Sequence, residues 1–148
     1  MITGIQITQK ILLLLYLAKA AERDIREKRV AVRPAVKMML LSGGLLILTT
    51  AAGRRLLRLG MAALPGMTVL LISGISREAI GKGDALVLLV VGFSLGAGAA
   101  CEVLAAGVFL SFPAALFVLI SKKGDRRTEL PFLPFLLAGY LLYLAAEG

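Results

Sequence analysis

The chain has 148 residues, of which 59% are apolar and 18% charged, and its mean hydropathy is +0.90. Soluble domains are usually about 45–50% apolar and about a quarter charged, so this composition excludes an ordinary soluble domain, a disordered chain and a disulfide-stapled scaffold. A membrane-spanning helix needs roughly 20 apolar residues. We therefore expect a single all-α, membrane-embedded domain over residues 1–148, a polytopic bundle with about six transmembrane helices.

Two residue types are absent or nearly so. There is no histidine, which excludes Ser-His and Cys-His nucleophile pairs and His-ligated metal sites, and there is a single cysteine, Cys101. We therefore expect neither a metal nor a cofactor. The net charge is +8. In a chain this apolar, Lys and Arg are expected to sort connections to the cytoplasmic side rather than to bind nucleic acid.

Six apolar runs predict the spans. In chain order they are Gly4–Ala21, Pro34–Gly53, Leu59–Ser76, Asp84–Ala100, Val103–Ser121 and Leu130–Glu147. The predicted connections include Glu22–Arg33 after the first span, Arg54–Arg58 after the second, and a minimal one at Cys101 and Glu102 after the fourth. Lys10 falls inside the first span, where its ammonium group must reach the interface or face the bundle.

The basic residues are distributed unevenly between the two sides. With their flanks, the connections after spans one, three and five hold seven, two and four Lys or Arg, or 13 of the 17. This asymmetry predicts that these three connections are cytoplasmic and that both termini lie outside. The Arg54, Arg55 and Arg58 trio fits this arrangement badly, because it falls on the opposite side.

The candidate chemistry lies in the aspartates, of which the chain has three: Asp24, Asp84 and Asp125. The predicted topology puts all of them on the cytoplasmic side. Asp84 enters an apolar run directly, and a carboxylate at that depth is a functional candidate. Two carboxylates about 3 Å apart tend to share one proton, so that one acts as a base on water while the other polarises a carbonyl. This aspartyl-protease chemistry needs no histidine, cysteine or metal.

The surroundings of each aspartate predict how it titrates. Four cations flank Asp24: Arg23, Arg26, Lys28 and Arg29. Their positive field favours the ionised form of Asp24, whereas the apolar residues after Asp84 favour its neutral form. Asp125 lies among four cations and is expected to be a solvated turn residue. Glu102 is predicted on the opposite side of the membrane from the aspartates.

Three segments resemble the type IV prepilin peptidases, and archaeal preflagellin peptidases share the pattern. Gly81-Lys82-Gly83-Asp84 resembles their Gly-x-Gly-Asp motif, and Asp24 with the basic stretch that follows resembles their first aspartate motif. The segment Pro131-Phe132-Leu133-Pro134-Phe135 resembles the Pro-Phe-x-Pro-Phe signature that opens the family's last helix. The three landmarks occur in the family's order and extend over most of the chain.

The resemblance implies a membrane aspartyl endopeptidase that removes the leader peptide from prepilins or pseudopilins, as partners in type IV pilus assembly or protein secretion. It implies Asp24 and Asp84 as the catalytic pair, with Gly81 and Gly83 shaping the loop that presents Asp84. It also implies a multi-pass protein of the bacterial cytoplasmic membrane, acting at the cytoplasmic face. The four-cysteine insert that accompanies methylation in many members is absent, so methyltransferase activity is not expected.

Two departures from the family pattern keep alternatives open. The first motif usually continues as Ile-Pro-Asn, where this chain has Val30-Ala31-Val32, and the second usually has a lysine where this chain has Leu86. A non-catalytic or degenerate relative acting in pilus or secretion assembly is one alternative. Another is a small membrane transporter in which Asp84 binds a cation or a proton.

Overall fold

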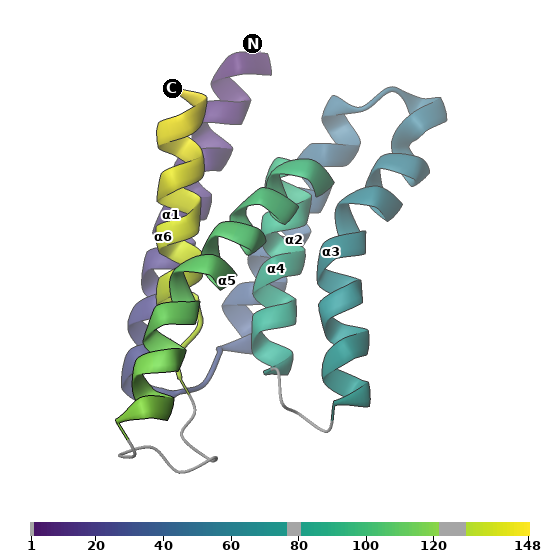
Figure 1. Cartoon of the computed structure of the whole chain (residues 1–148). Coiled ribbons are helices and arrows are strands. Elements are labelled where there is room, and N and C mark those ends of the chain that lie inside the picture. Colours follow the sequence, from purple (N-terminus) through teal and green to yellow (C-terminus); the bar gives the residue numbers. More distant parts are fainter. Residues whose placement is uncertain (1, 77–80, 122–129) are drawn as a thin grey trace.

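The fold is all-helical, as described by a computed structural model for residues 2–76, 81–121 and 130–148 (Figure 1). Its helices are α1 (Ile2–Glu27), α2 (Val32–Thr49), α3 (Arg55–Ile75), α4 (Lys82–Leu95), α5 (Ala97–Ile120) and α6 (Leu133–Glu147), with a 3₁₀ turn, η1 (Ala52–Arg54), before α3. No β-strand occurs in the three described ranges. The prediction of an all-α bundle of six helices is confirmed.

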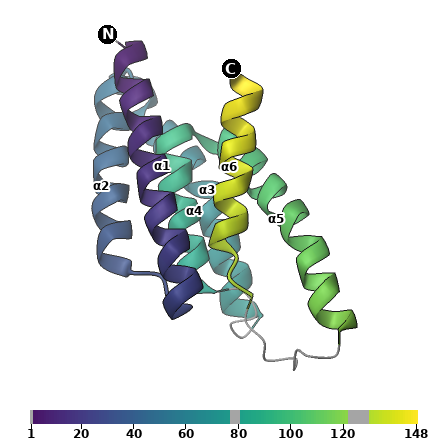
Figure 2. The same cartoon turned by 90° about the vertical axis from the view of Figure 1, so that its left-hand side faces the viewer.

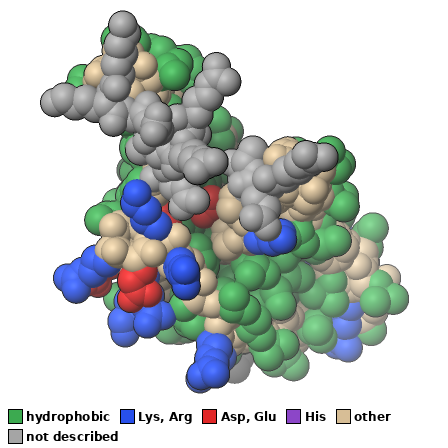
Figure 3. Space-filling view, turned by 90° about the horizontal axis from the view of Figure 1, so that it is seen from below, with side chains coloured by type: hydrophobic (Ala, Val, Ile, Leu, Met, Phe, Trp, Pro, Cys, Tyr) green, Lys and Arg blue, Asp and Glu red, His purple; other side chains and the backbone are tan. Residues whose placement is uncertain are grey.

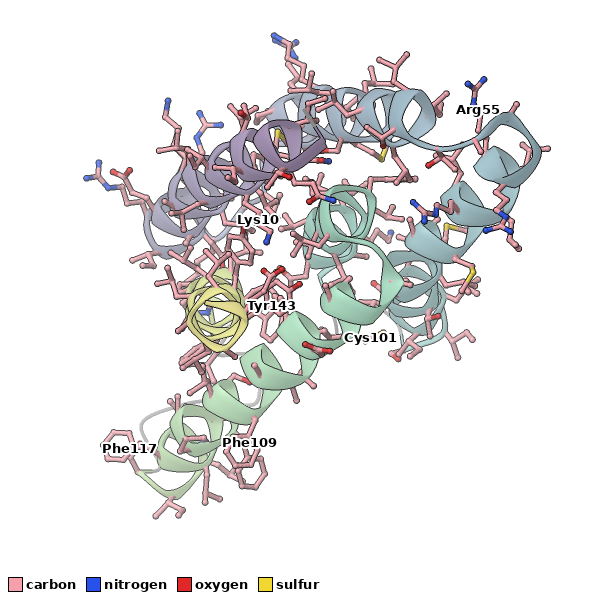
Figure 4. The ribbon with its side chains drawn as sticks, turned by 90° about the horizontal axis from the view of Figure 1, so that it is seen from above. Lys10, Arg55, Cys101, Phe109, Phe117 and Tyr143 are labelled. Carbon is pink, nitrogen blue, oxygen red and sulfur yellow. The ribbon has the colours of Figure 1, made fainter. Side chains whose placement is uncertain are left out.

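The helices are arranged around α4. Figure 4, which looks down the bundle, shows α4 in the middle, and α4 packs against α1, α2, α3 and α5. Helix α6 packs against α1 and α5, and α5 crosses the bundle obliquely (Figure 2). Helices α1 and α6 run antiparallel, with the two chain termini at the same end (Figure 1).

The composition of α4 explains its central place. Seven of its 14 residues are buried: Ala85, Val87, Leu88, Leu89, Val90, Val91 and Gly92. They are consecutive or nearly so rather than confined to one stripe, as expected of a helix that is surrounded on all sides. Gly92 has a specific role, because a Cβ at this position would overlap the backbone oxygen of Ala62 in α3. The absence of a side chain there lets the two helices approach closely.

Three segments are long and apolar enough to cross a membrane: Val32–Thr49, Ala52–Ile75 and Ala97–Ile120. Helices α4 and α6 have 14 and 15 residues, which at about 1.5 Å per residue is roughly 21–23 Å, less than the roughly 30 Å of a hydrocarbon core. Large apolar side chains point outward, among them Phe109 and Phe117 of α5, which are 80% and 72% exposed (Figure 4). Such a surface suits lipid, and the chain is a helical membrane protein.

The predicted connection at Cys101 and Glu102 is wrong. Both residues lie within α5, and the chain turns instead at Gly96, between Leu95 and Ala97. Gly96 has a φ of +92°, which a residue with a Cβ adopts only under strain. Hydropathy cannot reveal such a turn, because the residues on both sides of it are equally apolar.

Two other predicted boundaries also shift. Helix α1 continues beyond Ala21 to Glu27 and ends at Lys28, whose φ of +51° is left-handed. The predicted connection Arg54–Arg58 is largely helical, since α3 begins at Arg55. Charged residues with long side chains are good helix formers, so a helix can continue past the apolar run that defines a span.

Lys10 faces the bundle, which is one of the two predicted alternatives. Its ammonium group forms an ion pair with Glu147 of α6, and its backbone oxygen accepts a hydrogen bond of 3.0 Å from the Tyr140 hydroxyl. Figure 4 shows Lys10 and Tyr143 directed toward the space between α1, α4 and α6. A polar cavity of about 140 Å³ adjoins this ion pair. The end of the bundle that carries the termini is therefore tied together between α1 and α6.

Candidate functional site

The described helix ends that flank the α1–α2, α3–α4 and α5–α6 connections all lie at the end of the bundle opposite to the termini (Figure 1). We call this end the loop end. Figure 3 looks at the molecule from this end and shows Lys and Arg side chains spread over it. The described basic residues nearest to these connections along the chain are Arg23, Arg26, Lys28, Arg29, Arg33 and Lys82. The described helix ends beside the three connections thus share one end of the bundle, and the side of the membrane on which the connections lie stays a prediction.

Asp24 lies inside α1, close to the loop end, and only 7% of it is exposed. The prediction that it belongs to the connection Glu22–Arg33 is wrong, because α1 continues to Glu27. Leu13, Leu17 and Ala21 are buried on the same helix, and steps of four, four and three residues bring Asp24 onto their stripe. The apolar face of α1 therefore carries this carboxylate into the bundle.

The Asp24 carboxylate meets the first residue of α6. Its Oδ2 accepts a hydrogen bond of 3.1 Å from the backbone N–H of Leu133, in a buried position. The first N–H groups of a helix have no partner within it, and the side chain of Phe132 before α6 does not cap them. Sequence reasoning singled out the 131–135 segment only for its resemblance and missed this contact. The Pro134 that follows marks a helix start, and this is the signal that could have pointed to a free N–H nearby.

Two opposing effects act on Asp24, which lies beyond the apolar run of α1. Burial raises the pKa of its carboxyl above the usual value, and the hydrogen bond from Leu133 lowers it in part. The prediction that the neighbouring cations favour the ionised form of Asp24 is wrong for this pKa, because burial is the larger effect and acts in the opposite direction. These cations are exposed, and Arg26 pairs with Glu22 at 3.1 Å between Nη2 and Oε1 on the outer face of α1. Water screens their charge from the buried carboxylate.

Asp84 lies in the first turn of α4, outside the three helices of membrane-spanning length. Its backbone N–H donates to the Gly81 oxygen at 3.0 Å, which begins the helix. Burial, and then the negative charge of Asp24, raise the pKa of the Asp84 carboxyl to about 6. One carboxylate acts on another in this way only when they are near each other. The two residues, sixty positions apart in the chain, therefore lie within electrostatic reach of each other, and we call them the carboxyl pair.

The two motif glycines permit close approach to their neighbours. A Cβ on Gly83 would lie 2.6 Å from both Cβ and Cγ2 of Val30, which follows α1. A Cβ on Gly81 would lie 3.3 Å from Oδ2 of Asp84. Gly81 has a φ of −61°, which any residue can adopt. What the glycines supply is room, so that Val30 packs directly on the first turn of α4, beside Asp84.

The remaining acidic candidates do not join the pair. Asp125 lies outside the described residues. Glu102 is exposed in the first part of α5, and its position on the opposite side of the membrane stays a prediction. Among the described residues, no group of three or more His, Cys, Asp or Glu side chains is arranged to hold a metal ion.

Two hollows of the described surface lie away from the pair. The larger, of about 460 Å³, is formed by one face of α5 that runs from Cys101 to Phe112. The smaller is the polar cavity beside Lys10 and Glu147. The carboxyl pair lines neither of them.

Comparison of the chain with known protein families, with curated proteins and with solved structures found no match. The resemblance to prepilin peptidases therefore rests on the three motifs in the sequence. What the fold itself defines is a helical membrane protein with a buried carboxyl group, Asp24, whose charge acts on a half-buried one, Asp84, at its loop end.

Proposed function

We propose that this protein is a membrane aspartyl endopeptidase that removes the leader peptide from prepilin or pseudopilin substrates. The observation that carries the proposal is the carboxyl pair. Asp24 and Asp84 come from different helices, both are largely withdrawn from water, and the charge of one acts on the other. Two such carboxyl groups hold one proton between them more readily than none or two.

The proposed reaction is the hydrolysis of a peptide bond. The ionised carboxylate of the pair takes a proton from a water molecule, whose oxygen then forms a bond with the carbonyl carbon of the leader peptide. The protonated carboxyl donates a hydrogen bond to the carbonyl oxygen and stabilises the charge that develops there. Collapse of the tetrahedral intermediate breaks the C–N bond, and the leaving amine takes the proton that the first carboxylate removed from water, which returns the pair to its state with one shared proton. Since every proton is handled by a carboxyl group, neither EDTA nor a serine-directed reagent should inhibit cleavage.

The basic character of the loop end supports a cytoplasmic position for the pair. Thirteen of the 17 basic residues belong to the connections at this end or to their flanks. Lys and Arg are concentrated on the cytoplasmic side of membrane proteins. The proposed location is therefore the bacterial cytoplasmic membrane, with cleavage at its inner face and both chain termini on the outer side.

A second candidate is a non-catalytic role in pilus or secretion assembly. It is favoured by Val30, the first residue that departs from the family's pattern, because this side chain packs directly on Gly83 of the second motif. A departure at such a contact bears on the geometry of Asp84 itself. Leader cleavage separates the two candidates, since only the peptidase shortens its substrate.

The test is co-expression with candidate prepilins from the same organism, with intact-mass measurement of the product. Asp24→Asn and Asp84→Asn should each reduce cleavage by about 100-fold or more, the usual effect of losing a general acid or base. Glu22→Gln is the matched control, because Glu22 is an exposed carboxylate on the same helix as Asp24. It should cleave at the wild-type rate. Full activity of the Asp84→Asn protein, at equal abundance in the membrane, would refute the mechanism.

A further inference from the structure

The first turn of α6 uses its backbone N–H groups in an unusual way. Phe135 and Leu136 both donate to the Phe132 oxygen, at 3.0 and 3.1 Å. Pro134 has no N–H to donate. The N–H of Leu133 donates to the Asp24 carboxylate of α1. Asp24 thus serves as the cap of a helix that begins 109 residues later in the chain.

A matched register along α1 and α6 holds this contact in place. Lys10 and Asp24 are fourteen positions apart on α1, and Leu133 and Glu147 are fourteen positions apart on α6. At about 1.5 Å per residue both distances are roughly 21 Å. Since the helices run antiparallel, the Lys10–Glu147 ion pair and the Asp24–Leu133 hydrogen bond close opposite ends of one seam. Sliding one helix along the other would break both.

Buried residues of one apolar core lie on both helices along the seam between these two contacts. The buried residues that face it are Leu13, Leu17 and Ala21 on α1, and Leu133, Leu136 and Tyr140 on α6. Steps of three and four residues recur on both helices, the spacing of two helices packed along a common stripe. The seam therefore sets the position of the α6 amino terminus relative to Asp24.

We propose that the amino terminus of α6 is a positioning element that makes Asp24 the ionised member of the carboxyl pair, and therefore the base. This inference rests on the proposed function. An N–H group that donates to a carboxylate favours its charged form, and the positive end of a helix dipole acts in the same direction. Among the described residues, no such donor reaches the Asp84 carboxylate. Asp84 therefore keeps the shared proton and acts as the acid.

The other charged groups around Asp24 do not reverse this division. Helix α1 packs against α2, α4 and α6. At the loop end, the charged residues described on these helices are Arg33 and Lys37 of α2 and Lys82 and Asp84 of α4. The three cations are exposed to water, which screens them. The described part of α6 carries no charged residue in its first turn. On α1 itself, the flanking cations are exposed too.

The decisive experiment removes one hydrogen-bond donor, the N–H of Leu133. Leu133 is replaced by its α-hydroxy acid analogue during cell-free synthesis into lipid nanodiscs, which exchanges the donor N–H for an ester oxygen and keeps the side chain. The matched control is the same exchange at Phe135, whose N–H bonds to Phe132 rather than to Asp24. Infrared titration of the carboxyl band, with Asp24→Asn as the reference that identifies the signal, follows the protonation of Asp24 without any substrate.

The expected result is a rise of about one pH unit or more in the titration midpoint of Asp24 in the Leu133 ester, from the loss of a hydrogen bond to a charged group. The acid limb of the cleavage profile should move by the same amount. The Phe135 ester should move neither. An unshifted midpoint in the Leu133 ester, or an equal shift in both esters, would overturn the inference.

The wild-type protein supplies an independent check that needs no ester. Comparison with Asp24→Asn and Asp84→Asn assigns the two infrared bands, and Asp24 should lose its proton at the lower pH. If Asp84 ionises first, the inference is wrong. Absence of prepilin cleavage combined with the expected infrared shift would refute the proposed function and leave the positioning role supported. The two failures are therefore distinguishable.

Discussion

Replacing Gly83 by alanine should force the first turn of α4 away from Val30. The added Cβ would lie 2.6 Å from both Cβ and Cγ2 of Val30. Carbon atoms that are not bonded prefer about 3.5–4.0 Å, so each contact is about 1 Å too short. Overpacking of this kind typically costs about 1–3 kcal/mol. Because Asp84 is the next residue, a displacement of about 1 Å at the turn should also reduce cleavage by about 100-fold.

The measurement is thermal unfolding in detergent, followed by circular dichroism, together with the cleavage rate. For a chain of this length, each kcal/mol corresponds to roughly 2–4 °C in Tm. Gly44→Ala is the control, because Gly44 lies inside α2 with nothing within 4 Å of an added Cβ. Alanine in an open helical position gains about 0.5–1 kcal/mol through backbone entropy. In Gly83→Ala the overpacking against Val30 should cost about 1–3 kcal/mol of stability. The same gain in backbone entropy offsets a part of this cost.

Second-site changes at Val30 test the cause directly. Val30→Gly removes both short contacts and should restore stability and cleavage in the Gly83→Ala background. Val30→Ala removes only the Cγ2 contact and should restore less, since the Cβ contact of 2.6 Å remains. A Gly83→Ala protein as stable as the Gly44→Ala control, or one that Val30→Gly fails to rescue, would refute this reasoning.

Three further predictions concern topology, helix termination and pH. In a Cys101→Ala background, Glu27→Cys and Gly148→Cys should label from opposite sides of the membrane; labelling from the same side contradicts the six-span arrangement. Lys28→Gly should raise stability by about 0.5–1 kcal/mol, because Lys28 has a left-handed φ of +51°, while Glu27→Gly inside the helix should lower it; equal effects would exclude relief of strain. Folding raises the pKa of Asp84 from 3.8 to about 6, so its contribution to stability is complete below about pH 3.8 and is lost as the pH rises through about 6. Asp84→Asn, which does not titrate, should flatten that decline in denaturant unfolding, and an unchanged pH dependence would exclude Asp84 as its source.

The amino-acid sequence by itself determined the class of the fold. An average hydropathy of +0.90 and six apolar runs suffice to predict a helical membrane bundle, because burial in lipid requires helices whose backbone groups bond to one another. With six helices, parity puts the termini at one end and the three basic connections at the other. These inferences need only local composition and the order of the runs, and the structure agrees with both.

Helix boundaries were only partly predictable, because a helix need not begin and end where its apolar run does. The turn at Gly96 lies inside a stretch that is apolar throughout, and a φ of +92° leaves no trace in hydropathy. Helix α1 extends past its apolar run into charged residues that are good helix formers, which carries Asp24 from a predicted connection into the helix.

The surroundings of the carboxyl pair were decided by tertiary structure alone. The cations beside Asp24 in sequence point into water, whereas its hydrogen-bond donor, the N–H of Leu133, lies 109 residues away. Neighbours in sequence on a helix point in different directions, and only packing selects which of them faces the core. The residue types alone indicated that the chemistry of this chain depends on carboxyl groups. The packing of α1 against α4 and α6 decided which groups act on Asp24.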